Sequence, residues 1–299
     1  MPLTFKSQHI LATFLIIILV SVIYANTLQY PFILDDELLV KKNYLIRDWG
    51  FLPQIFQTDL TLSVKKEANF YRPMQTISYL LDYQLWRLNV VGFHLTSIIL
   101  FIINCLLVYW LIYLIVKDLT LSAMAALFFA SHPIYCETVT YISGRAEVLM
   151  GIFLMLSLLS FITYSDFKGE RRAVLYSLSI LSFILALLSK ELAIILPLAL
   201  LLYDFSFKKE NLCRVGTFLK RYSLFILVTA AYIILRLTVL RFSDKLPVTA
   251  SIVLWRRFLI VLANFNFYFG ILFFPFGLHM SRIFLTPRYF FDLYVICGS

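Results

Sequence analysis

The chain has 299 residues, of which 61% are hydrophobic and only 14% are charged, and its formal net charge is +9. A soluble domain is nearer half apolar and a quarter charged, so this composition excludes an ordinary globular protein and predicts a polytopic membrane protein. The 29 Phe and 18 Tyr residues suit lipid-facing helices with aromatic side chains at the membrane surface. Because the basic residues collect in loops, where they set topology and meet anionic headgroups, we expect membrane lipids and no nucleic acid as partners.

The first apolar stretch, 10–29, is long enough to cross a membrane and follows Lys6 near the N-terminus. No A-x-A cleavage pattern follows it, so we expect an uncleaved signal anchor rather than a removed signal peptide. The polar segment 30–87 comes next and is too long for a simple hairpin. We expect it to form an outer loop whose amphipathic pieces, 55–56 and 74–86, lie in the membrane interface as short helices.

Seven further spans are expected from stretches almost free of charge, with Arg236 as the exception: 88–116, 119–136, 148–165, 173–189, 192–203, 222–240 and 258–278. Together with the first, they predict an all-α fold of about eight transmembrane helices with the N-terminus inside, in a single domain over 1–299. Another apolar run begins just before the C-terminus, from which we expect a truncated chain.

The 12-residue stretch 192–203 is short for a span, and the alternative is one helix from 173 to 203 with Lys190 inside it. Two spans joined by a tight outer turn keep the basic segment 208–221 on the same side as 166–172, which obeys the positive-inside rule. We therefore favour two spans.

With this topology, five polar clusters fall on the outer side, whereas the inner loops carry plain basic charge. These clusters are DDE (35–37), YRP (71–73), HPIYCE (132–137), GRAE (144–147) and SKE (189–191). Their gathering on one face predicts a single site. The four cysteines and four histidines are dispersed, without CxxC, HxxxH or HExxH spacing, so no disulfide framework and no metal centre is predicted.

Asp35 and Asp36 are the candidate catalytic residues. A carboxylate partly removed from water at a membrane surface has a raised pKa and can remove the proton of an acceptor hydroxyl. The plainer alternative is a hydrated loop start or a helix N-cap. Adjacent side chains point in different directions, so we expect one of the two to face the reactants and favour Asp36.

Three cations near outer span ends, Arg72, Arg145 and Lys190, are candidates for binding phosphate, because Arg does so as a bidentate fork and Lys as a point charge. Snorkelling explains any one of them more simply, but three on one face beside two acids favours a site. The candidates for a substrate pocket are His132, Glu137, Glu191 and Tyr71. Their structural alternatives are a cap where Pro133 breaks a helix and an ion pair between Lys190 and Glu191.

Five segments, in this order, carry a resemblance to one family: YANTLQYPFILDDELLVKKNYLI (24–46), FYRPMQTISYLLDYQLW (70–86), GFHLTSIILFIIN (92–104), FFASHPIYCETVTYISGRAEVL (128–149) and LLSKELAIILPLALLLYD (187–204). Together they resemble the membrane part of the transmembrane and tetratricopeptide-repeat O-mannosyltransferases, in the GT-C glycosyltransferase superfamily, with the protein O-mannosyltransferases as cousins. The resemblance covers about residues 20–205. The chain departs from the family by lacking tetratricopeptide repeats and having fewer spans than is usual.

The resemblance implies transfer of a hexose such as mannose, with inversion, from a polyprenyl or dolichyl phosphate to a hydroxyl of a protein, peptide or lipid. The transfer would occur on the outer or lumenal face of a prokaryotic plasma membrane or an endoplasmic reticulum membrane. The acidic pair at 35–36 would be catalytic and the three cations would bind the donor phosphate. The lipid-linked sugar is a co-substrate, no cofactor is implied, and a role for a divalent metal stays open.

Two other classes of function stay open. A multi-pass transporter would line a substrate path with the outer charges, although the chain shows neither the internal repeats nor the mid-span charges typical of transporters, Arg236 excepted. A noncatalytic relative would bind a partner in the membrane and would lack activity as the intact protein.

Overall fold

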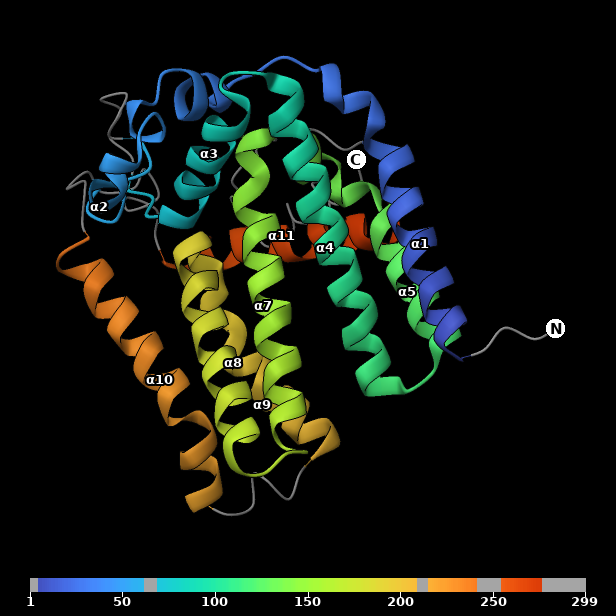
Figure 1. The fold of residues 1–299 in the computed structure, drawn as a ribbon. Coiled ribbons are helices and arrows are strands. Elements are labelled where there is room, and N and C mark those ends of the chain that lie inside the picture. The colour runs from blue at the N-terminus through green and yellow to red at the C-terminus, as the bar shows by residue number, and fades with distance from the viewer. Residues whose placement is uncertain (1–4, 62–68, 209–214, 241–253, 276–299) are drawn as a thin grey trace. The chain divides into compact units, whose positions relative to one another are not determined.

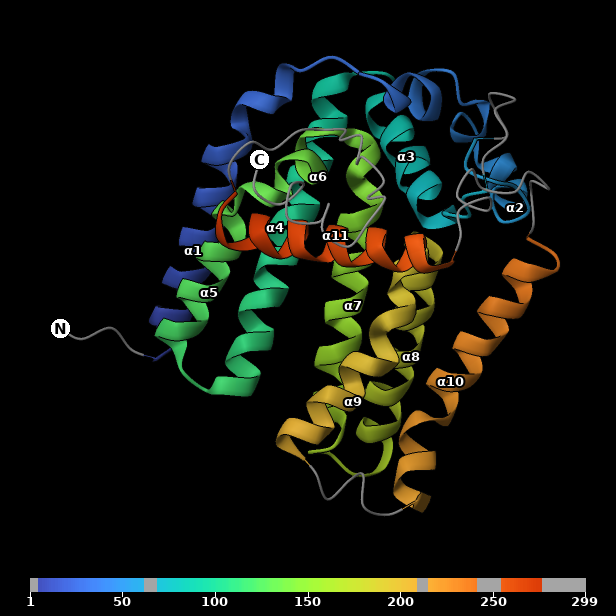
Figure 2. The same cartoon turned by 180° about the vertical axis from the view of Figure 1, so that it is seen from behind.

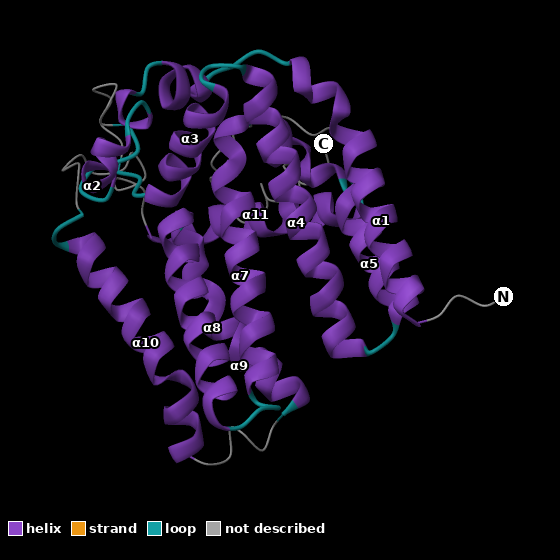
Figure 3. Cartoon of the chain, viewed as in Figure 1, coloured by secondary structure: helices purple, strands orange, loops and turns teal. Residues whose placement is uncertain are grey.

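The computed structural model describes residues 5–61, 69–208, 215–240 and 254–275, which are mainly helical and contain no strand (Figures 1 and 3). The α-helices are α1 (Phe5–Tyr24), α2 (Leu52–Ile55), α3 (Pro73–Trp86), α4 (Val90–Val116), α5 (Leu119–Ser131), α6 (Cys136–Thr140), α7 (Arg145–Tyr164), α8 (Gly169–Ser189), α9 (Leu196–Phe207), α10 (Val215–Leu237) and α11 (Leu254–Phe273). Short 3₁₀ helices and one π-helical turn, Glu37–Lys41, lie between them. The expected all-α class is confirmed.

Five helical segments are long and apolar enough to cross a membrane: Phe5–Gln29, Val90–Val116, Ile142–Tyr164, Gly169–Ser189 and Gly216–Leu237. Leu119–Ser131 and Pro133–Thr140 together would make a sixth, broken span. Each of the eight expected spans overlaps a helix, but α9 has only 12 residues, and the apolar part of α11 is Phe258–Phe273. The described residues therefore carry five or six spans by length, and the count of eight stays a prediction, with 276–278 outside the described residues.

The helices α7 and α8 form an antiparallel pair in the bundle (Figure 1). Two buried serines face each other in this pair: the Ser157 hydroxyl donates to the Ser179 backbone oxygen at 2.7 Å, and the Ser179 hydroxyl donates to the Ser157 backbone oxygen at 2.8 Å. Small side chains let helix backbones approach closely in a membrane. The pairing brings the start of α7 next to the end of α8, where two of the predicted polar clusters lie.

The expected break between the spans 173–189 and 192–203 is present. α8 ends at Ser189, Lys190 is extended, and a 3₁₀ helix, Glu191–Ile195, leads into α9. Figures 1 and 2 show α8 and α9 running in opposite directions. Lys208, just after α9, lies 3.3 Å from the carboxylate of Asp166 in the α7–α8 loop, so the end of α9 lies beside the basic segment 166–172, as the charge pattern predicts.

The polar segment after α1 is held against the bundle by α3, which corresponds to the expected helix at 74–86. Tyr79 and Leu80 on α3 are fully buried and join Leu39 and Val40 in an apolar cluster with Phe93 of α4. The other expected amphipathic piece, 55–56, falls at the end of the four-residue helix α2. Burial of one face of α3 therefore fixes the YRP sequence at its N-terminus against the transmembrane helices.

The expected span 119–136 is interrupted after Ser131, because His132 is extended before a 3₁₀ helix, Pro133–Tyr135. Proline lacks a backbone N–H and disfavours a helical conformation in the residue before it, which explains the break. Contacts group the chain into two units, 1–131 with 138–243 and 132–137 with 244–299, and each is described by itself. A single domain over 1–299 stays a prediction.

Candidate active site

Asp36 anchors the start of the polar segment. The residue is 1% exposed, and its Oδ1 accepts hydrogen bonds from the Ser143 backbone N–H at 2.8 Å and from the Ser143 hydroxyl at 2.6 Å. Its Oδ2 accepts a longer bond, 3.4 Å, from the backbone N–H of Ile33. Burial raises the pKa of the Asp36 carboxyl above its ordinary value, and the hydrogen bonds from Ser143 and Ile33 limit that rise because they favour the charged form.

The Ser143→Ala variant is expected to lose stability in a pH-dependent way, because alanine cannot donate the hydroxyl bond to the ionised Asp36. The folded carboxyl binds its proton more tightly than the unfolded one, so its contribution to the free energy of unfolding falls as the pH rises through the folded pKa. The variant raises that pKa further. Its deficit in melting temperature against the wild type should therefore grow with rising pH and shrink in acid.

A matched control for this titration is Ser157→Ala, which removes a buried serine hydroxyl from α7 whose partner among the described residues is Ser179. No carboxylate accepts its bond, so its destabilisation should stay constant across the same pH series. A constant deficit for Ser143→Ala as well would contradict the assignment of an ionised Asp36.

Asp35 differs from its neighbour by being exposed. Its carboxylate makes no hydrogen bond or ion pair with any residue that the structure describes, whereas its backbone N–H donates to the Tyr141 hydroxyl at 2.9 Å. Leu34, just before it, has a positive φ of 47°, a conformation that costs energy for a residue with a side chain. Glu37, two residues after it, pairs with Lys41 at 2.6 Å. Asp35 is thus the acid of the DDE cluster whose side chain is open to a ligand.

Gln75 of α3 connects the Asp36 anchor to the YRP cluster. Its Nε2 donates to the backbone oxygen of Ser143 and to the hydroxyl of Tyr79, each at 2.8 Å. The Tyr79 hydroxyl in turn donates to the backbone oxygen of Ile142 at 2.9 Å. The Oε1 atom of Gln75 is buried and has no hydrogen-bond partner among the described residues, which leaves one acceptor available at this point.

Arg72 precedes α3 and forms a fork with Glu191 of the SKE cluster. Its Nη2 lies 3.2 Å from one carboxylate oxygen and its Nε 3.5 Å from the other. Burial raises the pKa of Glu191, but the hydrogen bonds and charge of Arg72 outweigh it, so the pKa lies below its ordinary value. The Nη1 atom of Arg72 makes no hydrogen bond with the described residues, so a donor remains free.

Lys190, next to Glu191, pairs with Glu147 in the first turn of α7. The Lys190 side chain is 15% exposed, and an ammonium group has three donors, of which this contact uses one. The second carboxylate oxygen of Glu147 is buried without a hydrogen-bond partner in the described part of the chain. The pair therefore keeps both an unused cationic donor and an unused acceptor.

Side-chain contacts and sequence proximity join seven residues into one cluster, which we call the polar layer: Asp36, Ser143, Gln75, Arg72, Glu191, Lys190 and Glu147. Ser143, in the 3₁₀ helix Ile142–Gly144, is four residues before Glu147 in the first turn of α7, and Arg72 and Gln75 are three residues apart at the start of α3. Lys190 and Glu191 are adjacent. The structure thus brings together four of the five predicted polar clusters, from segments up to 155 residues apart (36 to 191).

Arg145 lies beneath the polar layer and is fully buried. Its Nη1 lies 2.6 Å from the Asp82 carboxylate, and its Nη2 donates to the Phe93 backbone oxygen at 2.8 Å and to the Ser97 hydroxyl at 3.2 Å. The Thr96 hydroxyl donates to the other Asp82 oxygen at 2.8 Å. This arrangement ties α3, α4 and α7 together, so the geometry favours a positioning role over the predicted contact with phosphate.

Tyr71 lies beside the polar layer and is buried, with its hydroxyl donating to the Phe56 backbone oxygen at 3.0 Å. Arg236 near the end of α10 holds the residues just before it, because its Nη2 donates to the Asn69 backbone oxygen at 2.7 Å. Tyr71 therefore supports the position of Arg72, and its hydroxyl is already engaged. Arg236, which interrupts an apolar span in the sequence, contributes to the same end of the bundle.

His132 and Glu137 belong to the second unit. The His132 Nδ1 accepts a hydrogen bond from the Ile134 N–H at 3.2 Å, and its Nε2 lies 3.0 Å from the Leu272 backbone oxygen of α11. Within this unit, His132 therefore caps the 3₁₀ helix Pro133–Tyr135, as the structural alternative for the HPIYCE cluster predicts. A pocket role for His132 and Glu137 stays a prediction.

Metal and disulfide sites can be assessed for the described part of the chain. No group of three His, Cys, Asp or Glu side chains there is arranged to hold a metal ion. Cys105 is a buried free thiol and Cys136 is exposed, and the other two cysteines lie outside the described residues.

The fold and the polar layer define a polytopic helical membrane protein with ionisable and amide side chains gathered at one end of its bundle. Comparison with known proteins shows 30% identity over 183 residues to protein O-mannosyl-transferase TMTC3 of Mus musculus, covering 59% of this chain and 20% of the relative. The identity to protein O-mannosyl-transferase F38B6.6 of Caenorhabditis elegans is 29% over 202 residues, covering 65% and 28%. The identity to protein O-mannosyl-transferase TMTC2 of Homo sapiens is 33% over 150 residues, covering 49% and 18%.

The expected resemblance is therefore confirmed. Protein O-mannosyl-transferases of the TMTC family are homologous to this chain over about half of its length or more. The matches span only 18% to 28% of the length of these relatives. No protein-family model matches the chain, and no solved structure matches it significantly.

Proposed function

We propose that this chain forms the membrane-embedded catalytic part of a GT-C-type glycosyltransferase. It would move a hexose, most simply mannose, from a polyprenyl or dolichyl phosphate to a Ser or Thr hydroxyl of a protein, with inversion. The observation that carries the proposal is that an exposed acid, Asp35, adjoins a polar layer holding two cations with unused donors, Arg72 and Lys190. The names of the relatives support mannose as the sugar and a protein as the acceptor.

Asp35 acts as the general base in this proposal. A base must come within about 3 Å of the acceptor hydroxyl, and Asp35 is exposed with an uncommitted carboxylate. Asp36 is 1% exposed and its Oδ1 accepts two bonds from Ser143, so an acceptor hydroxyl cannot reach it without displacing packed residues. The geometry therefore favours Asp35 as the base and Asp36 as the residue that positions it, although the sequence alone favours the reverse.

Arg72 and Lys190 stabilise the leaving phosphate. Charge builds on the phosphate oxygens as the bond to the sugar breaks, and fixed cations at that point lower the barrier. Both cations are already oriented by carboxylates, Arg72 by Glu191 and Lys190 by Glu147. The free Nη1 of Arg72 and the remaining hydrogens of Lys190 can contact the phosphate without dismantling either pair.

The sugar itself meets two buried acceptors of the polar layer, Gln75 Oε1 and Glu147 Oε2, which have no partner among the described residues. Unsatisfied buried acceptors are rare in native proteins because they are costly. Sugar hydroxyls are donors that would satisfy them. This pairing supports a hexose rather than an apolar group at the site.

The proposal places the chain in the endoplasmic reticulum membrane with the polar layer toward the lumen. The opposite end of the bundle carries Lys168, Arg171, Lys208 and Lys220, and basic residues in short loops and at the ends of spans favour the cytoplasmic side. The reported relatives are animal proteins, which supports the endoplasmic reticulum. A prokaryotic plasma membrane stays the alternative prediction.

The proposal predicts that Arg72→Gln and Lys190→Gln each lower kcat/KM for sugar transfer by about 10²–10³, the usual cost of removing one group that stabilises developing charge. Transfer would be measured with the purified full chain in lipid nanodiscs, using polyprenyl-phosphate mannose or glucose and a pool of Ser/Thr peptides. The matched control is Lys42→Gln, which removes an exposed cation from the same polar segment, close to Asp35 in sequence.

Equal losses in Lys42→Gln would mean that surface charge near the membrane, rather than the polar layer, affects the rate. No transfer by the wild type, with the donor still bound, would favour the noncatalytic relative. Transport of the donor across the bilayer without transfer would favour the transporter.

A further inference from the structure

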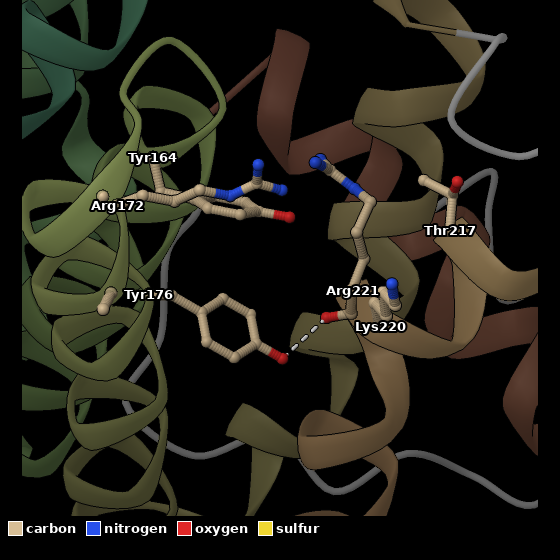
Figure 4. Close-up of a pocket in the computed structure, with 8 residues that line it drawn as sticks. Tyr164, Arg172, Tyr176, Thr217, Lys220 and Arg221 are labelled. Carbon is tan, nitrogen blue, oxygen red and sulfur yellow. Dashed lines mark hydrogen bonds between the residues drawn. The ribbon is translucent and has the colours of Figure 1, made fainter.

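A cavity lined in part by basic side chains lies at the end of the bundle away from the polar layer. It has a volume of 390 Å³ and is bounded by the C-terminal end of α7 and the N-terminal parts of α8 and α10 (Figure 4). Three cations line it, Arg172, Lys220 and Arg221. Tyr164, Tyr176 and smaller residues complete the lining. No acidic residue lines it in the described part of the chain. Nothing in the proposed transfer reaction uses this cavity.

Of the three cations, Arg221 is neutralised by the protein. Its Nε and Nη2 each lie 2.9 Å from a carboxylate oxygen of Asp204, and its Nη1 donates to the Ser165 hydroxyl at 2.9 Å. Arg172 and Lys220 are exposed and form no ion pair with any residue that the structure describes. Two positive charges without an ion-pair partner among the described residues therefore line the cavity.

Two arginine side chains reach into the cavity from opposite walls. Figure 4 shows Arg172 and Arg221 extending from opposite walls with their guanidinium groups facing across the gap. The Tyr176 hydroxyl donates to the Arg221 backbone oxygen at 3.0 Å and joins α8 to α10, and the Arg172 guanidinium lies 5.5 Å from the centre of the Tyr164 ring. An anion in this gap would meet the guanidinium of Arg172, which forms no ion pair with the described residues.

The cavity lies at the level where lipid headgroups are expected. Tyr164 ends one candidate span, and Gly169 and Gly216 begin the next two, so the cavity lies where three helices leave the hydrocarbon region. An Arg fork with a nearby Lys is the arrangement that binds phosphate, and basic pockets between transmembrane helices on the cytoplasmic side bind anionic headgroups. A free phosphate ion has the same chemistry, but its binding would not require the cavity to lie at the membrane surface.

We propose that this cavity binds the phosphate of an anionic lipid headgroup, held between Arg172 and Lys220 and flanked by the tyrosine rings. The site is separate from the polar layer, so the proposal stands whether or not the chain transfers sugar. It predicts a lipid-binding site that joins α7, α8 and α10 at the membrane surface.

The test is native mass spectrometry of the purified full chain titrated with dioleoyl phosphatidic acid. Arg172→Gln and Lys220→Gln are each expected to weaken binding by about fivefold, and the double variant by about 25-fold, the effect of one and two basic residues at a membrane surface. The matched control is Arg171→Gln, an exposed neighbour on α8 that does not line the cavity, and it should retain wild-type binding. Lys220→Arg keeps the charge and should also retain binding.

Two results would overturn the proposal. Equal weakening by Arg171→Gln would show that general surface charge, and not the cavity, holds the lipid. Displacement of phosphatidic acid by an equal concentration of inorganic phosphate would show that the cavity binds a free phosphate ion rather than a lipid headgroup. Melting temperatures of the variants without added lipid separate either result from a loss of folding.

Discussion

The Asp35→Asn variant is expected to lose sugar transfer by a factor of about 10²–10⁴, the usual contribution of a general base. Its stability should stay close to that of the wild type, because Asp35 is exposed and its side chain has no hydrogen bond or ion pair with the described residues. Asparagine has nearly the same shape but cannot accept the proton of the acceptor hydroxyl. The measurement is kcat/KM for transfer to a Ser/Thr peptide, together with donor binding and melting temperature.

Asp36→Asn is the matched variant one residue away, and it should behave differently. An amide at this position loses the charged hydrogen bonds to the backbone N–H and hydroxyl of Ser143. Hydrogen bonds to a charged group contribute about 1.5–3 kcal/mol each, so the variant should melt at a lower temperature than Asp35→Asn. A stable Asp36→Asn without transfer, beside an active Asp35→Asn, would reverse the two roles. Full transfer by both would remove the acids from the reaction.

Arg145→Met is expected to destabilise the fold by about 3–5 kcal/mol, because removing one partner of a buried ion pair leaves the other charge uncompensated. Asp82 is 2% exposed and would lose its bond of 2.6 Å to the guanidinium. The Phe93 backbone oxygen would lose a donor as well. The measurement is the free energy of unfolding of the purified protein in detergent, or the melting temperature where unfolding is irreversible.

The double variant Arg145→Met with Asp82→Leu should recover much of that loss, since a buried ion pair replaced by apolar side chains is often close to neutral. Arg72→Met breaks a more exposed pair, with Glu191 at 40% side-chain exposure, and should cost far less stability. A stable Arg145→Met that has lost donor binding would contradict the positioning role and return Arg145 to the phosphate site.

The spans and their breaks could be expected from the sequence because both depend on local properties. Apolar length predicted α1, α4, α7 and α8 to within a few residues of most ends. The prediction of two spans separated at Lys190, rather than one continuous helix, followed from the basic charge of the loops on either side. The proline after His132 could have predicted the end of α5 at Ser131, which the expected span 119–136 overran.

The partners of the site residues could not be expected in the same way. Asp36 and Ser143 are 107 residues apart, and Asp82 and Arg145 are 63 apart. Ser143, Gln75 and Asp82 carry no signal of their own in the sequence, because a serine, a glutamine and an acid on an amphipathic helix are ordinary surface residues. Their roles come from the packing of α3 against α4 and α7.

The sequence by itself determined that this protein lies in a membrane, that its polar chemistry gathers at one end, and which family it resembles. Hydrophobic length, loop charge and short motifs are properties of neighbouring residues, so no fold is needed to recognise them. Only the tertiary structure decided that Asp36 is an anchor, that Asp35 is open and that Arg145 is committed to Asp82. Exposure and hydrogen bonding depend on which distant segments meet, and that is set by how the helices pack.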